Sequence, residues 1–354
     1  MNGKKRLLTA STALAVCALA TAGAVSAQDK APVQIGLIAP VSGIYARPGQ
    51  VMKMGDGAPL ELAMIDSGDS VEKAANAAQR MVADFPDLVG ATGSYLSSFT
   101  LAVSEVTERA NLPLLTLSYS DLITERGFKN VFQTSATAGA QASIALPIIM
   151  DLAESETGKR PETVAIITDN TAASLSSVER MKGGLLDELG LEVVMEETFT
   201  PPLADASSLV QQVRTSRPDL LFFLPTVISD SNLILQKMQE FRVKVPTISF
   251  GIAIAEPEVL NVMDPALLEN VMSAVANWGV KGQEDLIARL KETYGEPWMT
   301  QNAISTYGDM WIFKAALEQA CSRDRQEVAE ALRNLDGGPS EYYPGGTLSF
   351  DEKG

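Results

Sequence analysis

The chain of 354 residues contains no histidine and only two cysteines, Cys17 and Cys321. The absence of histidine excludes a Ser-His-Asp triad, a Cys-His pair and a histidine-ligated zinc site. Cys17 lies in an apolar leader, so Cys321 is left alone and no intramolecular disulfide is expected. The fold must then be stabilised by its core, and apolar residues make up 46% of the chain, as in ordinary globular proteins.

Positive charge is also scarce, because 28 lysines and arginines face 44 aspartates and glutamates, for a formal net charge of −16. So acidic a chain disfavours nucleic acid and anionic membrane surfaces as partners. No two carboxylates stand at a spacing that indicates general acid–base catalysis. A Ser-Lys hydrolase is disfavoured too, because Lys129 and Lys182 have no nucleophile at a persuasive spacing. The sequence predicts no enzyme, no metal site and no cofactor.

The first 27 residues have the three parts of a cleavable export signal. The cations Lys4–Arg6 precede the apolar stretch Leu7–Leu19, and Val25–Ala27 provides a small-x-small end. This pattern predicts cleavage after Ala27, and the apolar stretch is shorter than the ~20 residues of a membrane span. Lipidation at Cys17 is the alternative reading of the same segment. We expect an exported, periplasmic protein.

Beyond the leader, short apolar runs alternate with helical stretches, which predicts an α/β fold with parallel sheets. The strand candidates are Val33–Ile38, Leu60–Ile65, Leu88–Ala91, Leu112–Leu117, Val131–Thr134, Thr163–Thr168, Leu191–Phe199, Asp219–Leu224, Pro246–Phe250 and Val271–Ala274. The helix candidates are Val71–Asp84, Ser97–Asn111, Gly139–Glu156, Leu175–Leu189, Ala206–Ser216, Ser231–Phe241, Gln283–Tyr294, Thr300–Cys321 and Arg325–Leu335. So many strands indicate two sheets, with breaks near Thr134–Gly139 and Gly251–Pro257.

The stretch Gly90–Ser98 is the first candidate site, because it follows a predicted strand and opens a helix. Ligands of open α/β sheets bind beyond the carboxyl ends of strands, and a helix N-terminus there offers N–H groups to an anion. Ser97 and Ser98 add hydroxyl groups, and Tyr95 lies in the same loop. Simple capping of the helix by a serine, without a ligand, explains the pattern equally well.

A second polar loop, Thr116–Asp121, follows the next strand. Its carbonyls and hydroxyls, at Ser118 and Ser120, could hold a polar head group, and Tyr119 could stack on a ligand. An ordinary turn is the alternative, since serine and aspartate favour turns. The loop after the first strand contributes Tyr45 as a candidate wall of the cleft, or as a plain surface tyrosine.

Taken in order along the chain, these segments resemble the type I periplasmic solute-binding proteins of ABC importers, the leucine/isoleucine/valine-binding-protein-like family. The matching segments are Ile35–Gly43, Val89–Ala91 with Ser97-Ser98, Leu112–Leu115 with Ser118–Ser120, Phe128–Thr134, Pro218–Phe222, Tyr307 and Leu348–Gly354.

The resemblance implies two doubly wound parallel-sheet lobes joined by a three-crossing hinge. Residues 28–138 and 254–338 would form the first lobe, and residues 139–253 and 339–354 the second, whose final segment is truncated relative to the family. By position, Ser97 would hold the ligand's carboxylate. Ser118 would offer its carbonyl to an ammonium group, and Ser120 would add hydroxyl and N–H contacts.

This sequence departs from the family in the second lobe. Where the amino-acid binders have a tyrosine, the chain has Asp169–Ser174, which makes Asn170 the candidate contact from this loop. A second tyrosine would fall near Thr226, and the acidic partner of the ammonium near Ala253. Burying an ammonium without a carboxylate is costly, so a branched-chain amino acid is disfavoured unless Asp169 or Glu256 compensates.

A second departure lies between Ile38 and Leu60, where prolines and glycines interrupt the sequence and predict a shortened first crossover helix. The favoured function is capture of a small polar or carboxylate-bearing molecule, amino-acid-like or an organic acid, for an inner-membrane ABC permease, by a monomer. A periplasmic sensor on the same scaffold and a degenerate, non-binding paralogue are the alternatives.

Overall fold

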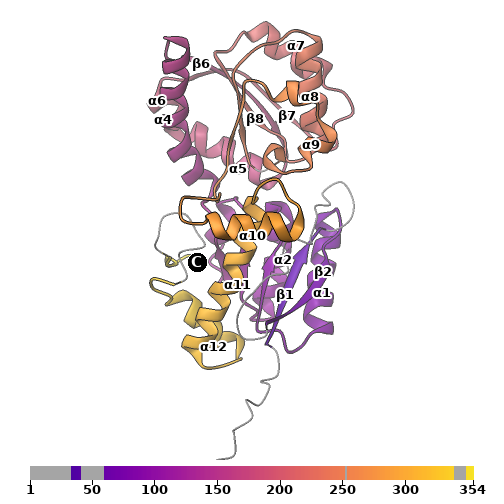
Figure 1. Ribbon diagram of the computed structural model, residues 1–354, viewed down its shortest axis with the longest axis vertical. Coiled ribbons are helices and arrows are strands. Elements are labelled where there is room, and N and C mark those ends of the chain that lie inside the picture. Colours follow the sequence, from indigo (N-terminus) through magenta and orange to yellow (C-terminus); the bar gives the residue numbers. More distant parts are fainter. Residues whose placement is uncertain (1–32, 41–59, 252, 339–347) are drawn as a thin grey trace, which may run out of the picture. The chain divides into compact units, whose positions relative to one another are not determined.

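The computed structural model describes residues 33–40, 60–251, 253–338 and 348–354. It contains two five-stranded parallel sheets with helices on their faces, one sheet in each of two lobes (Figure 1). The ten predicted strands are all present, with bounds that agree within two residues. The α/β prediction with two parallel sheets is therefore confirmed. The predicted export signal, Tyr45 and the shortened first crossover lie outside the described residues.

The first sheet has the strand order β2-β1-β3-β4-β5. Its strands are β1 (Val33–Ala39), β2 (Leu60–Asp66), β3 (Gly90–Gly93), β4 (Leu114–Thr116) and β5 (Val131–Gln133). One face packs on α1 (Val71–Asp84) and α2 (Ser97–Arg109), and the other on α11 (Gln301–Ala320) and α12 (Arg325–Arg333). A short helix, α3 (Leu122–Glu125), lies between β4 and β5, and α10 (Glu284–Tyr294) precedes α11.

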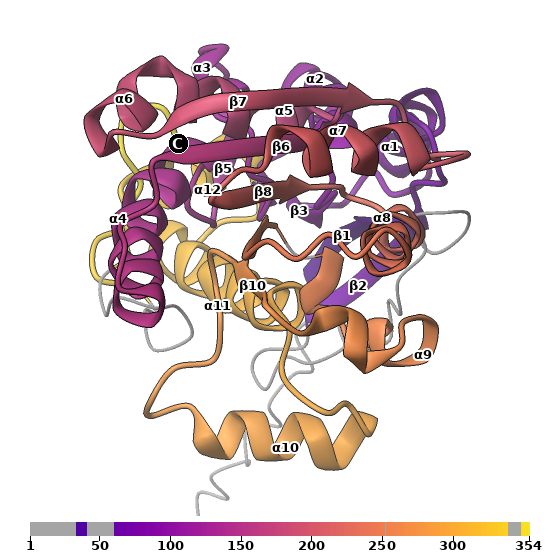
Figure 2. The ribbon, with the colours of Figure 1, turned by 90° about the horizontal axis from the view of Figure 1, so that it is seen from above.

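The second sheet has the order β10-β9-β8-β6-β7. Its strands are β6 (Thr163–Asp169), β7 (Glu192–Phe199), β8 (Leu220–Leu224), β9 (Thr247–Phe250) and β10 (Val271–Ala274). The helices α4 (Ala138–Thr157), α5 (Ala172–Arg180) and α6 (Leu186–Leu189) cover one face. The opposite face packs on α7 (Ser207–Ser216), α8 (Ile228–Glu240) and α9 (Val259–Val262), and Figure 2 shows α4 and α8 on the two sides of this sheet.

Apolar composition explains why β6 and β8 lie inside the second sheet and not at its edges. All five residues of β8 are buried, and the run Val164–Ile167 of β6 is fully inaccessible. Strands covered by helices on both faces need apolar side chains at every position, which is why these runs do not alternate with polar residues.

The two sheets have the same topology when each is numbered from its own first strand. In both, the first and third strands are neighbours, and the chain moves outward from them in opposite directions. This is the doubly wound arrangement, whose switch point lies between β1 and β3 in one lobe and between β6 and β8 in the other. Loops that leave the carboxyl ends of these strands are thus placed to form a site.

The second break between the lobes lies further along the chain than predicted. Strand β10 pairs with β9, and Val259, Met263 and Leu267 belong to the core of the second sheet. Residues 254–274 therefore belong to the second lobe, and the chain crosses back after Ala274. The assignment to the first lobe was wrong because the sequence identifies β10 as a strand without revealing which sheet it joins.

The final residues also lie elsewhere than predicted. Leu348 and Phe350 pack on the core of the first sheet, where the rings of Phe350 and Phe132 are 5.0 Å apart. The backbone N–H of Gln133 donates to the carbonyl of Gly354. Residues 348–354 thus belong to the first lobe, because their apolar side chains complete its core. The segment 339–347 lies outside the described residues.

The predicted helix Leu175–Leu189 consists of three pieces. Helix α5 begins at Ala172, a π-helical segment spans Met181–Leu185, and α6 follows. The interruption coincides with Gly183 and Gly184, and Gly184 has a φ of 125°. Gly190 ends α6 in a left-handed conformation, with a φ of 71°. Among the helices that the structure describes, none is both long and apolar enough to cross a membrane.

Candidate functional site

A cavity of about 300 Å³ lies where loops from both sheets meet. Every loop that lines it follows the carboxyl end of a strand, namely β2, β3 and β4 in the first lobe and β6, β7, β8 and β9 in the second. The lining residues are Asp69–Val71, Tyr95–Phe99, Leu117, Tyr119, Asn170, Thr171, Ala173, Ser174, Ser177, Thr200, Pro201, Pro225, Thr226, Phe250, Gly251 and Ala253. The cavity thus occupies both topological switch points.

The loop after β3 brings the start of α2 to the cavity. Gly93 has a φ of 107°, and a Cβ atom there would lie 2.2 Å from the carbonyl oxygen of Ile38, so only glycine fits. The next residue, Ser94, donates its N–H to this same carbonyl. The Ser94 carbonyl accepts hydrogen bonds from the hydroxyls of Thr100 and Ser118. These bonds fix the position from which α2 begins.

Ser97 is the first residue of α2, and its side chain is held from the neighbouring loop. Its Oγ accepts hydrogen bonds from the backbone N–H groups of Tyr119 and Ser120, both at 3.1 Å. Because both lone pairs of the oxygen are used, what Ser97 can offer a cavity ligand is its hydroxyl proton. The first turn of α2 adds backbone N–H groups and a positive helix end. This part of the cavity is suited to an anion.

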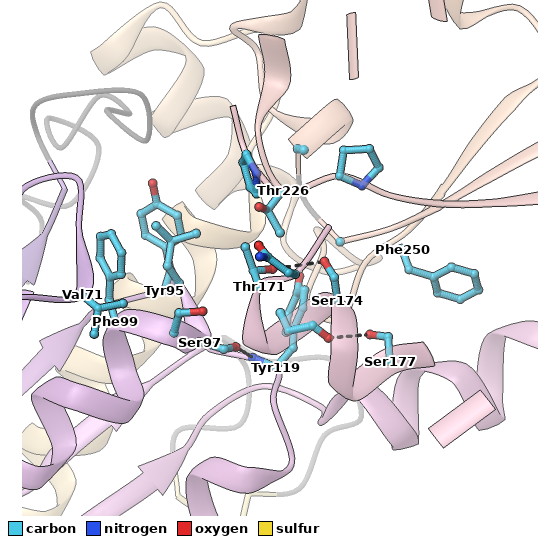
Figure 3. A pocket seen from close by; sticks show the side chains of 18 of the residues that line it. Val71, Tyr95, Ser97, Phe99, Tyr119, Thr171, Ser174, Ser177, Thr226 and Phe250 are labelled. Atoms are coloured by element: carbon cyan, nitrogen blue, oxygen red, sulfur yellow. Dashed lines mark hydrogen bonds between the residues drawn. The ribbon is translucent and has the colours of Figure 1, made fainter. Parts of the chain in front are cut away.

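In the second lobe, the buried Asp169 holds two cavity loops together. One carboxylate oxygen accepts the N–H and hydroxyl of Thr171, at 3.0 and 2.7 Å. The other accepts the N–H and hydroxyl of Thr226, at 2.6 and 2.7 Å. Thr171 also contacts the hydroxyl of Ser174 (Figure 3). This hydroxyl donates to the carbonyl of Leu224 at 2.8 Å. Because Asp169 accepts four hydrogen bonds from Thr171 and Thr226, it holds the two loops in place, and it does not line the cavity.

The walls are largely aromatic and apolar. Tyr95 and Phe99 lie on the first-lobe side in Figure 3, and Phe250 comes from the second lobe. The hydroxyl of Tyr119 donates to Oε1 of Gln301 at 2.6 Å. A Cβ atom on Gly251 would lie 3.8 Å from the Tyr119 ring, so this first-lobe ring reaches the second lobe. Hydroxyl groups and one amide, Asn170, supply the remaining polarity.

Charge is nearly absent from the lining. Asp69 is the sole aspartate, glutamate, lysine or arginine among the described residues that line the cavity. Its carboxylate forms an ion pair with Lys73 at 2.7 Å, and the hydrogen bond from Lys73 lowers the pKa of Asp69. Glu256 is buried and accepts a hydrogen bond from Asn302, outside the cavity. Neither Asp169 nor Glu256 is therefore placed to pair with an ammonium group.

Beside the cavity, α5 makes polar contacts with the first lobe. The N–H of Ala172 donates to Oγ of Ser98 at 2.9 Å, and the hydroxyl of Ser176 donates to the carboxylate of Asp121 at 3.0 Å. One turn further, Arg180 pairs with Glu125 at 2.6 Å. These residues recur every four positions, so a single face of α5 carries the contacts. The lobes are thus in contact around the cavity.

Five of the predicted site residues line the cavity, namely Tyr95, Ser97, Ser98, Tyr119 and Asn170. Ser118 and Ser120 are fully buried behind it. Their carbonyls accept hydrogen bonds from Nε2 of Gln133, at 2.8 and 3.1 Å, so the carbonyl of Ser118 already has a donor in place of the predicted ammonium group. The Oγ of Ser118 forms hydrogen bonds with the hydroxyls of Thr100 and Thr116, and it donates to the carbonyl of Ser94.

Sequence reasoning missed most of the second-lobe lining, including Thr171, Ser174, Thr226 and Phe250. The available signal was their position at the end of a predicted strand, or in the loop and first helical turn that follow one. The first-lobe residue Asp69 and its neighbours also follow a predicted strand. Applying the strand-end rule to every strand would have identified these loops.

Comparisons with known proteins agree with this architecture. The sequence model described as "Periplasmic binding protein" matches residues 32–354. A Leu/Ile/Val-binding protein homolog 7 from Brucella melitensis is 25% identical and covers 96% of this chain and 90% of that protein. Among solved structures, a leucine binding protein from Thermotoga maritima has a TM-score of 0.73 at 19% identity, covering 91% of this chain and 92% of that one.

A second solved structure is similar to the same extent. It is a solute-binding protein of an ABC transporter from Rhodopseudomonas palustris, in complex with 4-hydroxybenzoate. Its TM-score is 0.73 at 17% identity, and the match covers 91% of this chain and 89% of that one. At 17–19% identity, the two solved structures support the fold alone. The match of the family's sequence model to residues 32–354 is what indicates membership of a family.

Proposed function

This chain belongs to the periplasmic binding protein family, and we propose that it is the solute-binding component of an ABC importer, exported to the periplasm. In this role it captures a small carboxylate-bearing molecule between its lobes and delivers it to an inner-membrane permease. The observation that carries the proposal is the cavity at the two switch points, with the Ser97 hydroxyl and the start of α2 on one side. It binds and releases its ligand without converting it.

The lining favours an acid that lacks an ammonium group. An α-amino acid would bring its ammonium into a cavity whose sole described carboxylate, Asp69, is already paired with Lys73. An unpaired buried charge costs several kcal/mol, on the order of a thousandfold in affinity. Asp169 cannot relieve this cost without giving up one of its four hydrogen bonds.

The volume of the cavity and its aromatic walls narrow the expected class of ligand further. A volume of about 300 Å³ lies at the small end of the ~300–1,000 Å³ range of small-molecule sites. Rings from Tyr95, Phe99, Tyr119 and Phe250 give it flat apolar surfaces. A single-ring or short branched monocarboxylate fits this combination. The relative from Rhodopseudomonas palustris holds 4-hydroxybenzoate, an acid of this class.

Matched pairs of ligands test the proposal directly. Thermal-shift and calorimetric titrations compare 3-phenylpropanoate with phenylalanine, and 4-methylpentanoate with leucine. Each pair shares one carbon skeleton and differs in the ammonium group. We expect at least one acid to bind and to bind more tightly than its amino-acid partner, by about tenfold or more. Equal or tighter binding of the amino acids would refute the ligand class, and a folded protein that binds no member of a broad panel would refute the function.

A further inference from the structure

We propose that Gln301 is a positioning residue that couples the cavity wall at Tyr119 to the chain crossings between the lobes, and so favours the closed arrangement. Gln301 is the first residue of α11 and is fully buried. Its side-chain oxygen accepts three hydrogen bonds. They come from the hydroxyl of Tyr119 at 2.6 Å and from the backbone N–H groups of Ala276 and Asn277, at 3.0 and 3.3 Å.

The second and third of these donors belong to a crossing between the lobes. Residues 275–277 follow β10 of the second sheet and precede the segment that leads to α10 and α11. Rotation of one lobe against the other must change backbone angles in such crossings. Ala276 and Asn277 therefore cannot change direction without changing their bonds to Gln301.

A second crossing among the described residues, near Thr134, is tied to Gln301 through Asn277. Its Nδ2 donates to the carbonyl of Thr134 at 3.0 Å and to the hydroxyl of Ser305 at 2.8 Å. Thr134 lies between β5 and α4, where the chain first passes from one lobe to the other. Asn277 thus joins two crossings, and Gln301 joins them to the cavity.

The cavity end of this chain of bonds is the ring of Tyr119, which lines the cavity and reaches Gly251 of the second lobe. Asn277 and Gln301 are both buried, so water cannot readily replace a broken bond. The network consequently favours one arrangement of the crossings, in which the Tyr119 ring stands against the second lobe. A ligand that packs on this ring stabilises the same arrangement.

Two single variants and their combination test the coupling without any ligand. Tyr119→Phe keeps the ring and removes one hydrogen bond, and Gln301→Leu removes the shared acceptor. Spin labels at Arg80→Cys and Glu156→Cys, exposed positions in the two lobes, report the interlobe distance by pulsed electron resonance in a Cys321→Ser background. Tyr307→Phe is the matched control, because it loses a hydroxyl that bonds Arg289 within the first lobe.

We expect Tyr119→Phe to lower the ratio of closed to open molecules by about fivefold to tenfold, the equilibrium effect of one buried hydrogen bond. Gln301→Leu removes the acceptor of three hydrogen bonds and should lower this ratio at least as much. The double variant should add little to the larger single effect, since both changes break one network. An unchanged distribution in Tyr119→Phe, or shifts that add fully, would overturn the coupling. If Gln301→Leu does not fold, the comparison of Tyr119→Phe with the control Tyr307→Phe still tests the coupling.

The coupling depends on the proposed function only in that the cavity is taken to receive a ligand. The distance measurement is made on the protein alone. If no acid binds, the proposed function is refuted, but the distance measurement still tests the coupling. If the distance distributions do not change, the coupling is refuted, but the ligand titrations still test the proposed function.

Discussion

Ser97 combines a structural and a binding role in one hydroxyl group. Its oxygen accepts the N–H groups of Tyr119 and Ser120, so its proton is directed to other acceptors. A ligand carboxylate is the natural acceptor, and a hydrogen bond to a charged group is stronger than one between neutral groups. Through the two hydrogen bonds that its oxygen accepts, Ser97 also fixes the loop that carries the Tyr119 ring.

Ser97→Ala should weaken binding of a carboxylate probe by about 1–2 kcal/mol, because it removes a charge-assisted hydrogen bond. Calorimetry with 3-phenylpropanoate and with its primary amide separates the two roles of Ser97. Loss of the loop contacts affects both compounds, whereas loss of the hydroxyl proton affects the acid more. An equal loss for acid and amide would mean that Ser97 serves only the loop.

Asp230, at the start of α8, gives the fold a pH dependence that can be measured. Burial raises the pKa of this carboxyl above its ordinary value of 3.8, although the N–H of Leu203 donates to it. A raised pKa means that the folded state holds the proton more tightly. The resulting stabilisation is complete below the unfolded-state pKa and is lost as pH rises through the higher folded-state value.

Asp230→Asn removes this titration while keeping an oxygen that can accept from Leu203. The unfolding midpoint of the variant, relative to the natural protein, should therefore rise between pH ~3.5 and pH ~7. Denaturant unfolding at several pH values measures the difference. Asp187→Asn, at an exposed position in the same lobe, is the control. A difference that stays constant with pH would contradict the expectation.

Four of the five predicted residues that line the cavity, Tyr95, Ser97, Ser98 and Tyr119, lie in first-lobe loops that lead into a helix. Asn170 came from the position of a family contact. Ser118 and Ser120 are serines like Ser97 but face the interior, where Gln133 bonds both of their carbonyls and the carbonyl of Ser94 accepts the hydroxyl of Ser118. Composition alone cannot distinguish a hydroxyl facing the cavity from one facing the core, since both occur in the same turn.

At the scale of elements, helix α5 and the segment after it depart most from prediction. Continuous amphipathic character over 175–189 predicts one helix, yet a π-helical segment separates α5 from α6. Two adjacent glycines differ in conformation there. Gly183 has a φ of −71°, which any residue adopts, and Gly184 has a φ of 125°.

This pair gives a matched prediction. Gly183→Ala should leave stability unchanged or raise it by about 0.5–1 kcal/mol, because alanine restricts the unfolded chain and a Cβ meets no atom within 4 Å. Gly184→Ala should lower stability by about 1–2 kcal/mol, because alanine disfavours positive φ. Urea denaturation of both variants gives the comparison. Equal effects at the two positions would show that the bend does not depend on Gly184.

At the scale of the whole molecule, the strands could be predicted but their distribution between lobes could not. The apolar run Leu220–Leu224 of β8, all of it buried, predicts a strand, but the pairing partner of a strand is set by contacts distant in sequence. The two sheets have equal topology, yet the sequence shows no internal repeat. The boundary after Ala274 and the return of Phe350 to the first lobe depend on such long-range packing.

The contacts of α5 with the first lobe should affect closure more than folding. Arg180 pairs with Glu125 at 2.6 Å and with Asp121 at 3.5 Å across the lobes, and its side chain is 44% exposed. Arg160 forms two pairs of the same kind, with Asp151 and Glu154, inside the second lobe. Exposed ion pairs contribute little to stability, so neither Arg180→Gln nor Arg160→Gln should change the unfolding midpoint appreciably.

Only Arg180→Gln should change the interlobe distance distribution, toward wider separations, because only its ion pairs join the two lobes. Salt provides an internal check. At 1 M ionic strength the Debye length falls to about 3 Å, so the natural protein should approach the distribution of the variant, while the variant changes little. A natural protein insensitive to salt, or an equal shift in Arg160→Gln, would mean that these ion pairs do not hold the lobes together. The hydrogen bonds of Ser98 and Ser176 would then have to account for the contact of α5 with the first lobe.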